Sequence, residues 1–205
     1  SSPPLPVSSL PPPSEEPHPK AQRNFTDPDC RIQPTRDGFI AGYNGQIAVD
    51  QAHQVIISQQ LATNPADYAA LNPLMDQAKT NLGRKLREVS GDSGFASEAN
   101  IQAMVERKIE AYLTPGRSKH KDAHAGGERE LKNKPLMTAM ARKLKRAGRR
   151  SRYRLRKQTV EPVFGIIKSV MRFRQFLLRG LAAVRGEWSL VAMAWNIKRK
   201  AVLAG

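Results

Sequence analysis

The chain has 205 residues, with 34 Lys and Arg against 18 Asp and Glu, which gives a formal net charge of +16. No segment approaches the roughly 20 uninterrupted apolar residues of a membrane span. A single cysteine excludes a disulfide framework and a cysteine-based zinc site. The N-terminus lacks the basic region and apolar run of a secretory signal, so we expect a cytoplasmic protein. Because the chain starts at Ser1 and its first methionine is Met75, we expect a fragment or a processed piece.

The positive charge is concentrated in the second half of the chain. Residues 1–116 carry 10 Lys and Arg and 13 Asp and Glu, whereas residues 117–205 carry 24 and 5. Clustered cations release counterions from nucleic-acid phosphates, so this asymmetry favours a polyanionic partner. An anionic membrane surface is the rival interpretation, but the basic stretch 142–157 lacks the Trp, Phe and Leu face of an interfacial helix. The charge therefore predicts a nucleic-acid partner and no membrane.

The first half of the chain is typical of short strands and helices in alternation. Residues 1–24 hold eight of the fifteen prolines and are predicted to be a linker. Two β-branched segments, 43–49 and 54–61, predict a β-hairpin. Apolar residues then recur at helical spacing over 71–82, and Gly83 follows as a C-terminal stop.

A short strand over 86–90 leads into the turn Gly91-Asp92-Ser93-Gly94. Ser97 is then positioned as the N-cap of a helix, and residues 109–113 form a further apolar run. This order of elements predicts an α/β fold with a mixed sheet flanked by helices.

The second half is basic and helical. Residues 116–150 are predicted to be a basic loop or insertion, within which 131–148 could form a helix of low hydrophobicity. From Thr159 a strong helical pattern begins, with an apolar stripe over 160–171. A final helix over 184–203 is apolar on more than one side, as a buried closing helix would be.

Asp92 is a candidate catalytic residue, since it follows a predicted buried strand and lies between glycines. Open α/β sheets bind ligands at the carboxyl ends of their strands, and glycines allow a substrate to approach closely. The alternative is a simple turn in which the aspartate bonds its own backbone. Spacing alone favours the turn.

Glu161 begins the strong helix, and Lys168 follows two turns later on nearly the same face. A lone carboxylate in a cationic field can hold a divalent metal while the cations hold phosphates. The alternative is an acid stabilised by the N-terminal end of the helix dipole.

A nine-residue run over 149–157 holds six cations and no acid, which favours phosphate contact over a solvated charged face. Its candidate DNA-binding residues are Arg149, Arg150, Arg152, Tyr153, Arg154, Arg156 and Lys157. The four histidines do not cluster with carboxylates, so a zinc site is not expected.

Several motifs occur along the chain in one order, from about residue 21 to the end. They are Asn24-Phe25-Thr26-Asp27-Pro28-Asp29, Gly42-Tyr43-Asn44 with Gln46, Asp92-Ser93-Gly94-Phe95 with Ser97-Glu98, Val160-Glu161-Pro162-Val163-Phe164-Gly165 with Lys168, Phe176 to Leu181, and Glu187-Trp188. The ordered set resembles the C-terminal part of insertion-sequence transposases of the DDE superfamily, in the IS4/IS5-like assemblage.

The resemblance implies an RNase H-like fold in which two Asp and one Glu bind two Mg²⁺ or Mn²⁺ ions. Asp92 would be the second Asp and Glu161 the Glu, and both would be catalytic metal ligands. Lys168 would be the Lys of a Tyr/Arg/Glu/Lys signature. Tyr153 and Arg156 only approximate the signature's Tyr and Arg, and Lys157 fits the Arg position by spacing.

In this family the first Asp lies on a strand upstream of the segment that matches residues 24–29. We therefore expect residues 25–205 to be a partial catalytic domain without its first strand. We do not assign Asp27, Asp29 or Asp50 as the first catalytic Asp. With one of three carboxylates absent, we expect metal affinity and strand cleavage to be lost.

If Asp92 and Glu161 share a metal pair, their carboxylates should lie within about 10 Å of each other. We also expect strand 86–91 to lie inside the sheet, with the apolar stripe of helix 159–174 packed on it.

The sequence is consistent with three alternative functions. The first is a DNA transposase fragment, whose complete protein cleaves and joins strands at insertion-sequence ends by metal-dependent phosphoryl transfer. The second is a non-catalytic, basic DNA-binding remnant, and the third is a ribonucleoprotein component. The expected partners are the DNA terminal repeats, with either a second copy or a separate N-terminal transposase segment.

Overall fold

The structure is a computed structural model that describes residues 24–35, 38–63, 67–115, 133–147 and 156–205. Apart from Asn24, the predicted linker over 1–24 lies outside these ranges. The elements are β1 (Arg31–Thr35), β2 (Gly38–Gly42), β3 (Asn44–Val49), β4 (Ile56–Ala62), the 3-10 helix η1 (Asp67–Ala70), α1 (Leu71–Leu82), β5 (Glu88–Gly91), α2 (Glu98–Glu106), β6 (Glu110–Leu113), α3 (Pro135–Ala147), α4 (Arg156–Ser169) and α5 (Leu181–Ala204).

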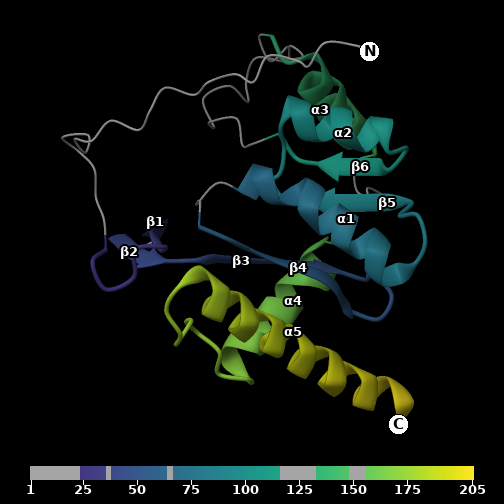
Figure 1. The fold of residues 1–205 in the computed structure, drawn as a ribbon. Helices are drawn as coiled ribbons and strands as arrows, with labels where there is room; N and C mark the ends of the chain where they lie inside the picture. Colours follow the sequence, from purple (N-terminus) through teal and green to yellow (C-terminus); the bar gives the residue numbers. More distant parts are fainter. Residues whose placement is uncertain (1–23, 36–37, 64–66, 116–132, 148–155) are drawn as a thin grey trace, which may run out of the picture.

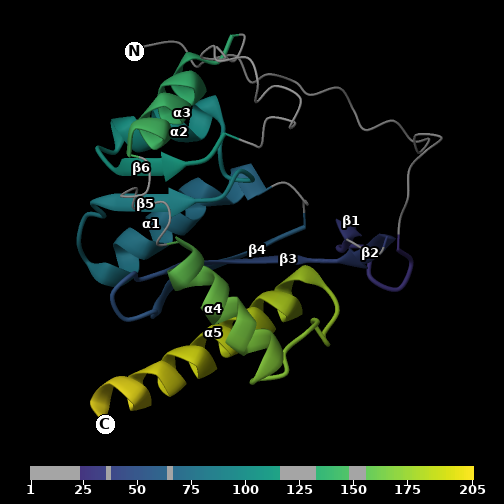
Figure 2. The same cartoon turned by 180° about the vertical axis from the view of Figure 1, so that it is seen from behind.

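Helix α1 lies near the middle of the molecule. Figure 1 shows β5, β6, α2 and α3 on one side of it, and the β3–β4 hairpin, α4 and α5 on the other. Figure 2 shows the same arrangement from behind, with α4 and α5 crossing beside the hairpin. In the part of the chain that the structure describes, no helix is long and apolar enough to cross a membrane.

The strands of the described residues form three two-stranded sheets. β1–β2 and β3–β4 are antiparallel pairs, and β5–β6 is a parallel pair. The mixed α/β class is confirmed, but one continuous mixed sheet is not found in these ranges. The prediction that strand 86–91 lies inside a sheet is wrong here, because β5 pairs with β6 alone.

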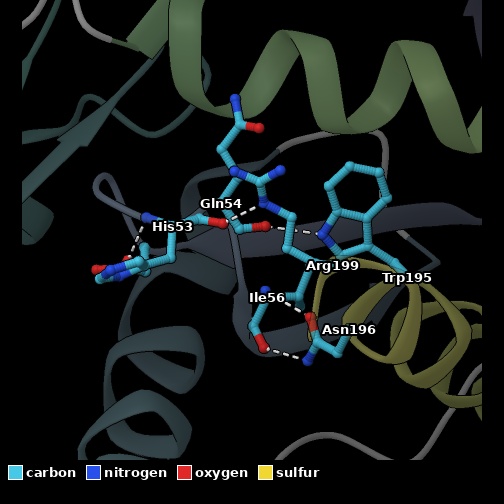
Figure 3. A network of polar contacts seen from close by, with 7 residues as sticks. His53, Gln54, Ile56, Trp195, Asn196 and Arg199 are labelled. Atoms are coloured by element: carbon cyan, nitrogen blue, oxygen red, sulfur yellow. Dashed lines mark hydrogen bonds and ion pairs between the residues drawn. The ribbon is translucent and has the colours of Figure 1, made fainter. Parts of the chain in front are cut away.

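The β3–β4 hairpin is confirmed, with Asn44 opposite Ala62 and a bulge between Ala48 and Val49. Helix α5 holds the turn of this hairpin through three side chains, which Figure 3 shows as a network. Trp195 Nε1 donates to the carbonyl of Gln54 at 2.8 Å, and Asn196 bonds both the N–H and the carbonyl of Ile56 at 2.8 Å. Arg199 donates to the carbonyl of His53. Residues separated by about 140 positions are thereby fixed together.

The ends of α1 and α2 follow the predicted signals. Gly83 ends α1 with a left-handed φ of 61°, which glycine adopts without a steric penalty. Ser97 caps α2, since its side chain accepts the N–H of Asn100 at 3.1 Å. Buried residues of α1, α2, α3 and β6 form one core cluster, which includes Leu74, Met104 and Leu113.

A second core cluster joins α4 and α5 to the β3–β4 hairpin. It holds Val163 and Ile167 of α4 together with Ile47, Ile56 and Trp188. The prediction that the α4 stripe packs on strand 86–91 is therefore wrong, because its buried residues belong to the hairpin cluster. The period of the stripe shows that this face is buried, but it does not identify the partner.

Pro162 lies inside α4 and has no N–H to donate. The carbonyl four residues earlier, that of Gln158, accepts the side chain of Gln54 at 3.0 Å instead. The proline thus frees an acceptor that ties α4 to the hairpin turn.

Residues 135–147 of the predicted basic loop form helix α3, as expected for 131–148. Met137 and Met140 are buried in the first core cluster. Lys143 donates to the carbonyl of Ala111 at 2.8 Å and lies 4.3 Å from the ring centre of Tyr112. Residues 116–132 lie outside the described part.

Candidate carboxylate site and nucleic-acid interface

Asp92 follows the last residue of β5, at the carboxyl end of a strand that is parallel to β6. Its side chain is half-buried, and Oδ1 accepts the N–H of Gly94 at 3.0 Å. The turn expected for Gly91-Asp92-Ser93-Gly94 is therefore present. Gly91 is required by packing, since a Cβ there would lie 2.9 Å from the side chain of Leu113. The fold thus presents a carboxylate at the edge where parallel strands end.

A second carboxylate, Asp67, lies against this turn and was not singled out by sequence reasoning. Its Oδ2 lies 2.5 Å from where a Cβ of Gly94 would be, so a side chain at position 94 would require Asp67 to shift. Its Oδ1 accepts the side-chain amides of Asn44 at 2.6 Å and Gln46 at 2.5 Å. The sequence held one indication of this contact, because Gln46 is a polar residue on β3 whose side chain is buried.

Gln46 itself is 5% exposed, and its Oε1 has no hydrogen-bond partner among the described residues. Buried polar atoms are usually paired, because an unpaired one costs about 1–3 kcal/mol. The region between β3 and the Asp92 turn therefore holds an acceptor that is available to a further polar group.

Glu161 and Lys168 both lie on the exposed face of α4, as their seven-residue spacing predicts. Gly165 lies between them, and no atom comes within 4 Å of the position of its Cβ. Lys168 Nζ lies 5.8 Å from the ring centre of Phe164. This face carries a carboxylate and a cation, with open space at the glycine between them.

The basic run lies only partly within the described chain. Arg156 and Lys157 form the first turn of α4. The other predicted DNA-binding residues lie outside the described ranges: Arg149, Arg150, Arg152, Tyr153 and Arg154.

Asp92 follows β5 and Glu161 lies on α4, and these two elements pack on different core clusters. Val89 of β5 packs on the first core cluster, whereas Val163 of α4 is buried in the second. The close approach of the two carboxylates stays a prediction.

A divalent metal fits this donor set only in part. Carboxylate oxygens are the ligands that Mg²⁺ prefers, and a pair of ions needs several of them. Within the described residues no group of three or more His, Cys, Asp or Glu could hold a metal ion. Asp92 and Glu161 are therefore an incomplete ligand set here.

The acids near the N-terminus have structural partners. Asp27 is buried, and its carboxylate accepts the hydroxyl of Tyr43 at 2.8 Å and the N–H of Gly180 at 3.3 Å. Asp29 accepts the N–H of Leu181 at 2.9 Å, at the start of α5. Both acids fix residues 27–29 to the start of α5.

The environment of Asp27 changes two pKa values. Burial alone raises the pKa of Asp27, but hydrogen bonds from Tyr43, Gly180 and Asp29 outweigh it and lower this pKa below its ordinary 3.8. Burial and the bond to Asp27 raise the pKa of Tyr43. Asp27 is therefore a charged anchor at neutral pH.

Asp50 accepts the backbone N–H of His53 at 2.8 Å and lies 3.1 Å from its Nδ1. Both side chains are exposed in the hairpin turn. This arrangement stabilises the turn.

A family model described as a transposase DDE domain matches residues 17–197, a range that spans both Asp92 and Glu161. No curated protein and no solved structure matches the chain.

Proposed function

The chain belongs to the family of transposase DDE domains, and we propose that Asp92 and Glu161 are two of its catalytic, metal-holding carboxylates. The reaction class is phosphoryl transfer with Mg²⁺ or Mn²⁺, which cleaves and joins strands at insertion-sequence ends. The observation that carries the proposal is the family match, which covers both carboxylates, together with the position of Asp92 at the end of a parallel strand. An RNase H-like fold is part of the proposal.

The third carboxylate is proposed to come from a strand outside the described residues. Within these ranges β3 bonds to β4 only and β5 to β6 only, so each keeps one edge without a partner strand. Unpaired strand edges are templates for a further strand. We propose that a separate N-terminal transposase segment supplies it, with a second copy of the chain as the alternative donor.

The outer edge of β4 offers no such place, because side-chain amides already bond its backbone. Gln77 Oε1 accepts the N–H of Gln59 at 2.7 Å, and Asn81 donates to the carbonyl of Ile57 at 2.8 Å. On β3 the carbonyl of Gln46 likewise accepts Trp188 Nε1 at 3.2 Å. Among the described contacts, the edge of β5 is therefore the better supported place for a strand donor.

DNA is the substrate that a transposase domain implies. We propose that the residues of the basic run contact phosphates without reading sequence, together with Lys168 on the exposed face of α4. The specificity of this chain for terminal repeats of one insertion sequence is a further part of the proposal.

A non-catalytic DNA-binding remnant is the second candidate function. It is favoured by the lack of a three-ligand metal group among the described residues. Under this alternative the chain binds DNA but cleaves none, even when the N-terminal segment is supplied.

Strand cleavage distinguishes the two candidates. Duplex DNA that ends in the terminal repeat is incubated with Mg²⁺ or Mn²⁺ and the chain, with and without the N-terminal segment. We expect no cleavage by the chain alone and cleavage by the two parts together. Asp92→Asn and Glu161→Gln should each abolish it, whereas the matched exposed acids in Asp50→Asn and Glu106→Gln should leave it unchanged.

Two results would contradict the proposal in different ways. Strong cleavage by the chain alone that disappears in Asp92→Asn would show that no third carboxylate has to be supplied. Cleavage by the two parts that survives Asp92→Asn or Glu161→Gln would remove that residue from the site.

A further inference from the structure

A cavity of about 890 Å³ lies where the loop between α4 and α5 meets β2 and β3. Its wall is aromatic, with the half-buried rings of Phe164, Phe173 and Phe176 around the buried Trp188. Phe173 and Phe176 meet edge to face with ring centres 5.4 Å apart, and Phe176 meets Trp188 in the same way at 5.9 Å. The neighbouring rings fix one another while part of their surface stays open.

Cations line the same cavity. Lys168, Arg174 and Arg179 are exposed and contribute to its wall. In the described part of the chain, none of the three forms an ion pair with a carboxylate. An aromatic wall is thus combined with positive charge that is available to an external anion.

The acids that hold this loop bind backbone N–H groups. Three carboxylates hold the loop between α4 and α5 and the start of α5 in place. Glu187 accepts the N–H groups of Leu177 and Leu178 at 2.9 to 3.1 Å, Asp27 that of Gly180 at 3.3 Å and Asp29 that of Leu181 at 2.9 Å. The loop is therefore positioned by its acids, and its cations are left for a ligand.

We propose that this cavity binds unpaired nucleotides of a single DNA strand. The bases stack on Phe173 and Phe176, and the phosphates lie at Lys168, Arg174 and Arg179. Stacking on aromatic side chains beside cations is how proteins hold single strands, and a cavity of this volume accommodates a nucleotide-sized ligand. The inference rests on the proposed function for DNA as substrate. It adds a preference for DNA with an unpaired strand over a blunt duplex.

The test compares a duplex that carries a single-stranded tail with a blunt duplex of the same sequence, by fluorescence anisotropy at fixed salt. We expect roughly tenfold tighter binding of the tailed DNA, as for one base stacked on an aromatic ring. A 2-aminopurine base in the tail should lose fluorescence when it stacks. Phe173→Leu should remove both the preference and the quenching and leave blunt-duplex affinity unchanged. Phe39→Leu, an exposed ring outside the cavity, is the control.

A second variant leaves the aromatic rings of the cavity unchanged. The double change Arg174→Gln and Arg179→Gln alters exposed side chains only, and it should weaken tailed DNA more than blunt DNA. Arg185→Gln removes an exposed cation of α5 outside the cavity and should weaken both forms equally.

Each of the following outcomes contradicts the inference. Equal affinity for tailed and blunt DNA in the unaltered chain overturns it and leaves the proposed function standing. A tail preference that survives both the Phe173 and the arginine variants also overturns it. Displacement of the tail by polyglutamate as readily as by single-stranded DNA of equal charge shows attraction to charge alone. Failure to bind any DNA contradicts the proposed function itself, and the inference with it.

Discussion

The buried carboxylate of Asp27 should stabilise the fold through its bonds to Tyr43 and to the start of α5. In Asp27→Asn the side chain keeps one acceptor oxygen and loses its charge, so one of the N–H groups of Gly180 and Asp29 is left unpaired. A hydrogen bond to a charged group contributes about 1.5–3 kcal/mol. We expect the variant to lose about 2 kcal/mol, which lowers the urea midpoint by roughly 1 M.

The pH dependence gives an independent check on this anchor. Because the pKa of Asp27 is below 3.8 in the folded chain, its contribution is fully present at neutral pH. It is lost as the pH falls through the folded pKa, where the carboxyl group takes up a proton. The difference between the unaltered chain and Asp27→Asn should therefore shrink in urea titrations below about pH 4. A difference below about 0.5 kcal/mol at pH 7, or one that persists unchanged at pH 3, would refute the reasoning.

Three further changes follow from the fold and the charge. Gly165→Ala should stabilise α4 by about 0.5–1 kcal/mol in thermal unfolding but weaken DNA binding, whereas Gly186→Ala on α5 should only stabilise. Equal DNA affinity in both variants would show that no DNA approaches Gly165. Ser97→Ala should cost about 1 kcal/mol in urea unfolding because α2 loses its cap, and Ser93→Ala should cost less. The five arginines of the basic run are Arg149, Arg150, Arg152, Arg154 and Arg156. Replacing all five with glutamine should make DNA affinity fall less steeply as the salt concentration rises. An unchanged dependence on salt would place the phosphate contacts elsewhere.

Local signals predicted most of the elements. The hairpin of β3 and β4, the stop at Gly83 and the cap at Ser97 each depend on residues within a few positions, so the sequence alone identifies them. The β1–β2 hairpin was missed, since β1 contains a proline and β2 is a largely exposed strand with glycine at both ends. Neither strand shows the alternation of a half-buried strand.

Long-range partners were beyond local signals. The stripe of α4 revealed a buried face, but its partner is the β3–β4 hairpin rather than strand 86–91. Asp27 and Gly180 are bonded across 153 positions, so no spacing rule connects them. The position of Asp92 after a strand could be predicted, whereas the contact of Asp67 with Gly94 depends on tertiary packing.

The most direct test of the central claim asks whether Asp92 and Glu161 share one divalent ion. Fe²⁺ replaces Mg²⁺ in the chain bound to terminal-repeat DNA and the N-terminal segment, and ascorbate with peroxide then produces radicals that cut the protein near the ion. We predict cuts close to residue 92 and close to residue 161 in the same sample, both suppressed by excess Mg²⁺. Cutting at only one of the two positions, or at neither while DNA stays bound, would contradict the shared site.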